Sequence, residues 1–204
     1  LMFNLDYKKI IQGINSVLKK DLKKNLISNA ANLLTFITKS KIDTHVSLIY
    51  SHSLLSYGYW HQQLLAESIG KNGKDFTPII SECPKDHHSV MQLYLGGKRN
   101  KFFTFFKIIN NKKDLPIKDY FDQKFKKSSL NNIIDAQFNA TINVFKKNLI
   151  PFRVILIDQK KPIQSFISLL VYSMLETAIL CKALDLNPFN QPAVEAIKKE
   201  TYSL

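Results

Sequence analysis

"KFFTFFKII", residues 101–109, carries apolar side chains at odd and at even positions. Successive side chains of a β-strand point to opposite faces of the sheet, so both faces of this segment are apolar. Strands of this kind occur in parallel sheets that helices cover on both sides. The stretch therefore predicts a strand in the interior of an α/β sheet.

Three more segments have the character of strands, namely "THVSLIY" (44–50), "TPIISEC" (77–83) and "PFRVILID" (151–158). The first of them is short, is bounded by polar residues and is rich in β-branched and aromatic types. The segments between the strands show helical spacing, and alternation of strands with helices is typical of a layered α/β domain with a mostly parallel sheet. Ligands of such sheets bind beyond the carboxyl ends of the strands. We therefore expect the site among the loops that follow 44–50, 77–83 and 101–109.

Apolar residues at helical spacing predict six helices. The first five cover 7–40, with Asp6 as N-cap, 51–67, 86–95, with an acidic cap, 129–147 and 163–184, and the last one follows the proline-containing loop at 187–192. The segment 163–184 is long and apolar, but Ser165, Glu176 and Lys182 are among the polar residues that interrupt it. A membrane span needs about 20 predominantly apolar residues. We expect a core helix that packs on the sheet, and no membrane contact.

The bulk composition predicts one domain with a single core. The chain has 204 residues, 45% of them hydrophobic, which is enough for one sizeable core. Cys83 and Cys181 match no metal or redox spacing, and no signal-like start is present, so we expect a reduced, cytoplasmic protein. The chain begins with Leu1 and Met2 rather than with methionine, which suggests a longer polypeptide.

A net charge of +13 raises the question of nucleic-acid binding. The basic residues are scattered lysine pairs, and Arg99 and Arg153 are the only arginines in the sequence. Base readout favours the planar guanidinium, and a nucleic-acid footprint clusters on one face. We therefore interpret the charge as a solvated, lysine-rich surface and expect no nucleic-acid partner. The same positive field would attract a small anionic substrate.

Two motifs suggest a phosphate loop and a zinc site, but both lack the residues or the spacing that such sites need. Gly70-Lys71 lacks the earlier glycine and the following Ser or Thr of a phosphate loop, and a helix rather than a strand precedes it. Cys83, His87, His88 and His61 do not have the paired spacing of a zinc site. We therefore expect no metal and no cofactor. The histidines could cap and flank a helix, or one of them could be a general acid or base.

Glu67 ends the helical stretch that is followed by the small and basic turn "GKNGK" (70–74). A solvated helix end is one interpretation. However, Glu67 shares a helix face with Trp60 and Leu64, and a carboxylate beside apolar surface is a stronger base than one in water. The second interpretation is therefore a proton-abstracting base at the edge of a pocket. Lys198 in the last helix has the same two interpretations, surface residue or site residue.

Three blocks, in order, resemble the carboxyl-terminal half of the glucose-6-phosphate isomerase family. "AESIGKNGK" (66–74) is similar to its Glu-Ser-x-Gly-Lys signature, and "DHHSVMQLYLGG" (86–97) is similar to its Asp-Gln-His-Ser block. "NPFNQPAVEAIKK" (187–199) resembles its Asn-Pro-Phe-Asp-Gln-Pro ending. The resemblance implies a single sugar-isomerase-type (SIS) domain over 1–204. This is a three-layer α/β/α fold with a mostly parallel sheet, in which a loop and helical tail at 185–204 complete the site.

The resemblance also implies a reaction and roles for four residues. Glucose 6-phosphate and fructose 6-phosphate interconvert through a cis-enediol(ate), without metal or nucleotide. By resemblance, Glu67 moves the proton between C2 and C1, and His88 opens the ring from across a homodimer interface. Lys198 assists ring opening, and Gln191 contacts the substrate. One carboxylate poised over two adjacent carbons, shielded from water, is what such a proton shuttle needs.

The chain departs from the family pattern in two ways. His87, Asn190, Ala193 and Asp75 stand where the family usually has Gln, Asp, Gly and Gly. More importantly, the Ser/Thr-rich phosphate loop of the amino-terminal SIS domain has no counterpart here, and neither arginine lies in a matching motif. Without those donors the charge of the enediolate loses a large stabilising interaction. We therefore expect this chain to be inactive alone and to need an amino-terminal domain.

Two alternatives remain open at the level of sequence. One is a sugar-phosphate-binding SIS module that has lost its chemistry. The other is an isomerase domain within a fusion enzyme, for example after a transaldolase.

Overall fold

The computed structural model describes residues 6–40, 42–73, 75–109, 114–117 and 128–202. Its elements, in chain order, are α1 (Tyr7–Val17), α2 (Lys20–Lys39), β1 (Thr44–Ile49), the short 3₁₀ helix η1 (His52–Leu54), α3 (Leu55–Ile69), β2 (Thr77–Glu82), the 3₁₀ turn η2 (Lys85–His87), α4 (Met91–Gly96), β3 (Lys101–Ile109), α5 (Leu130–Lys147), β4 (Phe152–Asp158), α6 (Pro162–Ala183) and α7 (Pro192–Tyr202). Most of 110–127, where the polar and lysine-rich sequence predicts a loop, lies outside the described residues.

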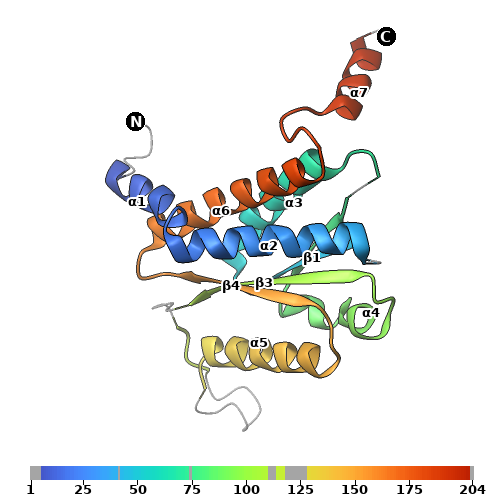
Figure 1. Ribbon diagram of the computed structural model, residues 1–204. Helices are drawn as coiled ribbons and strands as arrows, with labels where there is room; N and C mark the ends of the chain where they lie inside the picture. The colour runs from blue at the N-terminus through green and yellow to red at the C-terminus, as the bar shows by residue number, and fades with distance from the viewer. Residues whose placement is uncertain (1–5, 41, 74, 110–113, 118–127, 203–204) are drawn as a thin grey trace.

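The four strands form one parallel sheet in the order β2-β1-β3-β4. Helices α1, α2, α3 and α6 lie on one side of the sheet, and α5 lies on the other (Figure 1). The predicted three-layer α/β/α class is therefore confirmed. The carboxyl-terminal helix α7 extends away from the layered body (Figure 1) and has no buried residue.

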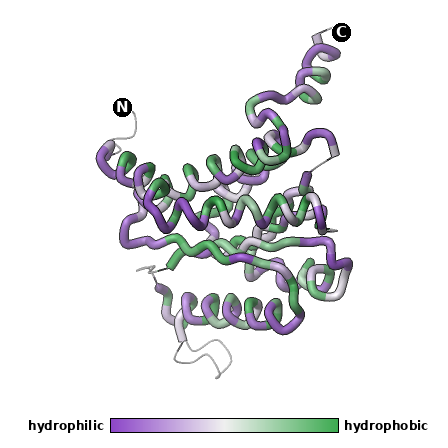
Figure 2. Tube along the Cα trace, in the orientation of Figure 1, coloured by the Kyte–Doolittle hydropathy of each residue, from purple (hydrophilic) through white to green (hydrophobic). Residues whose placement is uncertain are grey.

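Strand β3 is the doubly covered strand that its sequence predicts. Phe103 and Phe105 enter the core between the sheet and α5, while Phe102 and Phe106 enter the cores on the opposite face. All four are at most 5% exposed, and each contributes roughly 1.5–3 kcal/mol through burial of its ring. Figure 2 shows largely hydrophobic strands between helices along which hydrophobic and hydrophilic residues alternate.

Helix α6 meets the length and composition of a membrane span, but it packs here as a core helix. It contacts α1, α2, α3 and β4, and it buries Ser173, Glu176 and Thr177 together with Leu169 and Leu180. A buried carboxylate that has a partner in the sheet, described below, belongs to a protein interior rather than to lipid.

Two predicted helices differ from the structure. The segment 7–40 is two helices, because Lys19 adopts an extended conformation between them; Asp6 caps the first, as predicted, by accepting bonds from the backbone N–H groups of Lys8 and Lys9. The helix expected over 86–95 is wrong at its start. Asp86 accepts a bond from the backbone N–H of Glu82 at 2.8 Å instead of capping a helix, and α4 begins at Met91.

Candidate active site

Glu67 lies in the last turn of α3, half-buried, and both of its carboxylate oxygens have partners. The side-chain amide of Gln191 donates to Oε2 at 2.7 Å, and that of Gln63 donates to Oε1 at 2.8 Å. Two of the four predicted site residues, Glu67 and Gln191, are thus brought together from segments 124 residues apart. Two amide donors fix the plane of the carboxylate, and its remaining lone pairs can still accept a proton.

The tail loop that carries Gln191 is held on the end of α3 by further bonds. Lys71 Nζ donates to the backbone oxygen of Asn187 at 2.5 Å, and Ser68 Oγ donates to that of Pro188 at 3.5 Å. Gly70 ends the helix in close contact with its own last turn, since a Cβ there would lie 2.4 Å from the backbone oxygen of Ala66. Gly70 thus ends the helix, and Lys71 holds the tail loop against it. Sequence reasoning missed this role of Lys71, although the pair itself was visible in the signature.

The Glu67–Gln191 pair lies at the amino ends of the strands, not where the sequence predicted the site. Residues 70–76 separate α3 from the first residue of β2, and Gln62 Nε2 reaches the backbone oxygen of Pro78 at 2.8 Å. The loops after the strands, where the sequence predicts the site, therefore do not contain these two residues. The reason is topological, because Glu67 lies at the end of α3, the helix that returns the chain to the amino ends of the strands.

His88 lies at the opposite, carboxyl ends of the strands, after β2 and η2, and is exposed. Its neighbour His87 is half-buried and shares a 2.7 Å hydrogen bond with the hydroxyl of Tyr50, the residue that follows β1. Burial and the nearby His88 lower the pKa of His87, which favours its neutral form. The two adjacent histidines therefore differ, since His87 is a partner of Tyr50 and His88 faces outward.

Within one chain the predicted catalytic groups are separated. β2 has six residues, and at about 3.3 Å each this places its two ends roughly 20 Å apart. Glu67 lies near one end and His88 near the other. Lys198, 55% exposed, pairs with Glu195 of its own helix at 2.7 Å. Among the described residues, no hydrogen bond or ion pair joins Glu67 to His88 or to Lys198.

Arg153 is buried in a network of its own, away from Glu67. Its two terminal nitrogens donate to the carboxylate of Glu176 at 2.6 and 2.8 Å, and its Nε donates to Thr104 Oγ1 at 2.9 Å. The hydroxyl of Thr104 also bonds to His45 Nε2 at 2.7 Å. With each of its three nitrogens bonded to one of these partners, Arg153 joins the sheet to α6.

The described residues offer little for metal or thiol chemistry. They contain no cluster of three His, Cys, Asp or Glu side chains that could hold an ion. Both cysteines are free and buried, and burial raises the pKa of Cys83 to about 12, so that this thiol stays protonated.

Comparison with known proteins gives relatives along nearly the whole chain. A probable glucose-6-phosphate isomerase of Methanococcus maripaludis is 34% identical over 96% of this chain and 45% of its own length. The glucose-6-phosphate isomerase of Methanocaldococcus jannaschii is 32% identical over 98% of this chain and 51% of its own length. No family model matches. The chain thus spans about half the length of the curated relatives that it matches.

Two solved structures share the fold. A hypothetical protein of Thermus thermophilus aligns over 97% of this chain and 50% of its own, with a TM-score of 0.85 and 21% identity. A glucose-6-phosphate isomerase of Chlamydia trachomatis aligns over 96% of this chain and 42% of its own, with a TM-score of 0.78 and 17% identity. At these identities the two likenesses establish the fold. The family rests on the archaeal sequences, and from them the chain belongs to the glucose-6-phosphate isomerase family.

Proposed function

We propose that this chain is the part of a glucose-6-phosphate isomerase that supplies the proton-transfer base, and that Glu67 is that base. The observation that carries the proposal is the 2.7 Å bond from Gln191 to Glu67. It joins two residues that the family resemblance assigns to the same site, and it comes from the tail loop that Lys71 clamps in place.

The proposed chemistry needs one base and no co-reactant. Glu67 takes the proton from C2 of the open-chain aldose phosphate. The C2–H electron pair forms the C1=C2 bond of a cis-enediol(ate), while the π electrons of the carbonyl pass to O1. A proton moves from O2 to O1, and the protonated Glu67 then delivers its proton to C1 as the C2=O2 bond forms, which gives the ketose phosphate. Gln191 and Gln63 hold the two oxygens of the carboxylate, so the base does not need to reorient between the two carbons.

The positions of His88 and Lys198 suggest how the rest of the site is assembled. A residue roughly 20 Å from Glu67 across the strands cannot reach the same sugar from the same chain. We therefore assign His88 to the site of a partner subunit, where its exposed position allows it to open the ring. Lys198 would reach the ring oxygen after α7 docks, and the exposed Val194 and Ile197 give that helix an apolar surface for docking.

Two functions are assigned to the part of the enzyme that this chain lacks. The phosphate of the substrate and the negative charge of the enediolate both need donors, and Arg153 is buried with each of its three nitrogens bonded to Glu176 or Thr104. The relatives are about twice as long as the matched region. We propose that their other half supplies both groups, and that this chain alone has little or no isomerase activity.

The test is Glu67→Gln in the full-length enzyme. Loss of a general acid–base group lowers turnover by about 10²- to 10⁴-fold, while the midpoint of urea unfolding stays the same. Exchange of the C2 proton with solvent should fall with turnover. Asp21→Asn, which neutralises a carboxylate in the first turn of α2, is the matched control and should keep full activity. Ordinary turnover by Glu67→Gln would remove Glu67 from the mechanism.

A further inference from the structure

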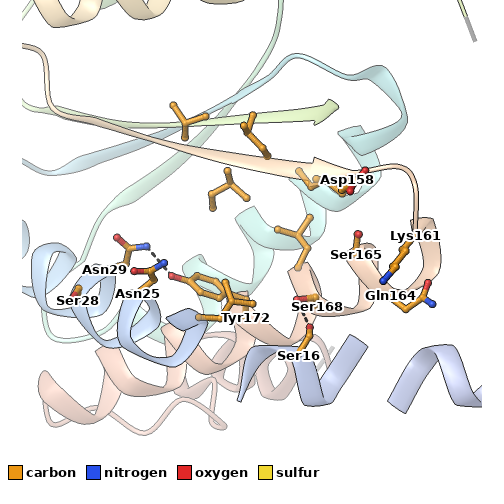
Figure 3. A pocket seen from close by; sticks show the side chains of 16 residues that line it. Ser16, Asn25, Ser28, Asn29, Asp158, Lys161, Gln164, Ser165, Ser168 and Tyr172 are labelled. Atoms are coloured by element: carbon orange, nitrogen blue, oxygen red, sulfur yellow. Dashed lines mark hydrogen bonds between the residues drawn. The ribbon is translucent and has the colours of Figure 1, made fainter. Parts of the chain in front are cut away.

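The groove beside β4 contains none of the predicted site residues. It has a volume of about 530 Å³ and lies between β4 and helices α1, α2 and α6 (Figure 3). Two polar pairs, Asn29 with Tyr172 at 2.8 Å and Ser16 with Ser168 at 3.0 Å, link these helices. His88 lies elsewhere, in the loop between β2 and α4 at the carboxyl ends of the strands. The contacts that set the direction of His88 therefore belong to that loop and its neighbours.

The loop is fixed on both sides of His88. The carboxylate of Asp86 accepts from the backbone N–H of Glu82 at 2.8 Å and from the hydroxyl of Ser89 at 3.3 Å. The ring of His88 itself makes no hydrogen bond with the described residues, so its direction follows from the backbone that carries it. Because adjacent Cα atoms are only about 3.8 Å apart, the side chain of His87 is the nearest anchor.

His87 connects this loop to the core between the sheet and α5. Its Nε2 lies 2.7 Å from the hydroxyl of Tyr50 and 3.5 Å from the hydroxyl of Thr141 in α5. Tyr50 is 3% exposed, and its ring packs on those of Phe105 and Phe138, with centroids 5.9 and 5.0 Å away. The residue before the predicted ring-opening histidine is therefore held by a tyrosine that the core keeps in place.

The geometry of this bond suits a neutral His87. Burial raises the pKa of Tyr50 above its usual value, so its hydroxyl remains a proton donor. The hydroxyl of Thr141 already donates to the backbone oxygen of Gln137 at 2.8 Å. With the ring proton on Nδ1, Nε2 of His87 is a bare acceptor for the hydroxyl of Tyr50. A protonated ring carries N–H groups on both nitrogens, and Tyr50 can then no longer donate to it.

The surroundings of His87 disfavour its protonated form. Burial and the adjacent His88 lower the pKa of His87, and Asp86 raises it by a smaller amount. The carboxylate of Asp86 already has two donors in the loop. The titratable groups on the neighbouring elements are Tyr50 after β1, Cys83 after β2, Lys107 in β3 and Asp135 in α5, the last two paired with each other. Protonation of His87 therefore adds a charge beside His88 and removes the acceptor of Tyr50.

We propose that His87 is a positioning residue for ring opening. Neutral His87 holds the loop on Tyr50, so that His88 is directed at the site of a partner subunit, and protonated His87 releases the loop. The inference rests on the proposed role of His88 in ring opening. His87 does not touch the sugar and acts through the direction of the next residue. Loss of its bond, by mutation or by acid, should slow ring opening and leave the base Glu67, roughly 20 Å away across the strands, unchanged.

Interconversion of the anomers of glucose 6-phosphate isolates ring opening from proton transfer. The full-length Glu67→Gln variant lacks the base, but opening and reclosing of the ring still exchanges the α and β anomers. NMR exchange spectroscopy measures this exchange above the uncatalysed rate, and each further substitution is added to this variant. If His88→Asn does not slow the exchange, the proposed role of His88 is wrong, and the inference about His87 fails with it.

The positioning bond is tested at about pH 8, where His87 is neutral. We expect Tyr50→Phe and His87→Ala each to slow the exchange about fivefold, the effect of one lost hydrogen bond. His87→Gln should keep the parental rate, because its amide oxygen can accept from Tyr50. Tyr94→Phe removes another buried hydroxyl, which bonds to Ser81 at 2.7 Å, and as the control it should have no effect. Equal rates for His87→Ala and His87→Gln would contradict the proposal.

The pH profile gives a readout that a merely structural role of His87 would not change. The exchange rate of Glu67→Gln is divided by that of the double variant with His87→Gln, so that the titration of His88, common to both, cancels. We expect this ratio to be constant above pH 6.5 and to fall about fivefold at lower pH, as His87 takes up a proton. A ratio that stays constant down to about pH 5 would overturn the proposal, since protonation would then not release the loop.

Discussion

Gln191 donates from its side-chain amide to Oε2 of Glu67 at 2.7 Å, although 124 residues separate the two in the chain. The bond connects the tail loop after α6 to the last turn of α3, and the bond from Lys71 to Asn187 supports the same loop. The orientation of Glu67 therefore depends on a segment that folds onto α3 from the other end of the chain.

Gln191→Ala should impair catalysis without unfolding the protein. A hydrogen bond to a charged group contributes about 1.5–3 kcal/mol, so the loss of this one should lower kcat by about tenfold or more. The control is Gln62→Ala, which removes a neighbouring amide that bonds to Pro78 rather than to Glu67. Steady-state kinetics of the full-length variants checks the difference. Equal kcat values for Gln191→Ala and the control would show that this bond does not position the base.

The Arg153–Glu176 pair should be important for stability. The two side chains are 12% and 4% exposed, and removal of one partner from a buried pair leaves an uncompensated charge. We expect Glu176→Gln to lower the free energy of unfolding by about 3–5 kcal/mol. Glu195→Gln, which breaks the exposed pair with Lys198, should change it by less than about 1 kcal/mol.

Urea titration of the two variants measures both effects. A double variant, Arg153→Met with Glu176→Leu, should recover most of the loss, because no buried charge is then left without a partner. A Glu176→Gln variant as stable as Glu195→Gln would contradict this account of the network.

Stability should fall as the pH drops from 6.5 to 5. His45 and His61 are buried, and desolvation, with Arg153 nearby, lowers the pKa of His45 well below its usual value and that of His61 to about 3. The unfolded chain binds protons at these residues below pH 6.5 and the folded chain does not. Their contribution to stability is therefore complete above pH 6.5 and is lost as the pH falls towards the folded pKa.

For His61 alone, the loss between pH 6.5 and pH 5 is on the order of 2 kcal/mol. The phenyl ring of a His61→Phe variant cannot titrate and suits the contacts of His61 with Tyr57 and Phe106. Urea midpoints measured across this range should therefore vary less with pH in the variant than in the parent. Identical slopes would mean that His61 does not titrate as its burial implies.

Much of the fold could be predicted because its strands are apolar on both faces. Phe102, Phe103, Phe105 and Phe106 occur in a pattern that only a doubly covered strand can bury, and the structure confirms this. The break at Lys19 could not be predicted, since the apolar periodicity continues on both sides of it. The helix expected over 86–95 was wrong because the side chain of Asp86 bonds to the backbone of β2, which is a tertiary contact.

The candidate site was predictable as a set of residues but not as an arrangement. The motifs gave Glu67, Gln191, His88 and Lys198 as candidates, whereas the general rule for parallel sheets indicated the carboxyl ends of the strands, where the first two do not lie. Which edge a helix end reaches depends on the direction of the crossover, and the partners of Lys71 and Arg153 lie 116 and 23 residues away in the chain. Such distant pairings leave no local pattern in a sequence.

Glu67 and His88 are proposed to act on one sugar although they lie at opposite ends of the strands. Mixed dimers test this proposal most directly. Full-length Glu67→Gln and His88→Asn variants, each inactive, are unfolded together and refolded in equal amounts. In a symmetric dimer, half of the products are hybrids, and each hybrid has one intact shared site out of two. We therefore predict about a quarter of the activity of the unmodified enzyme. A refolded mixture that is as inactive as the two single variants would contradict a site shared between subunits.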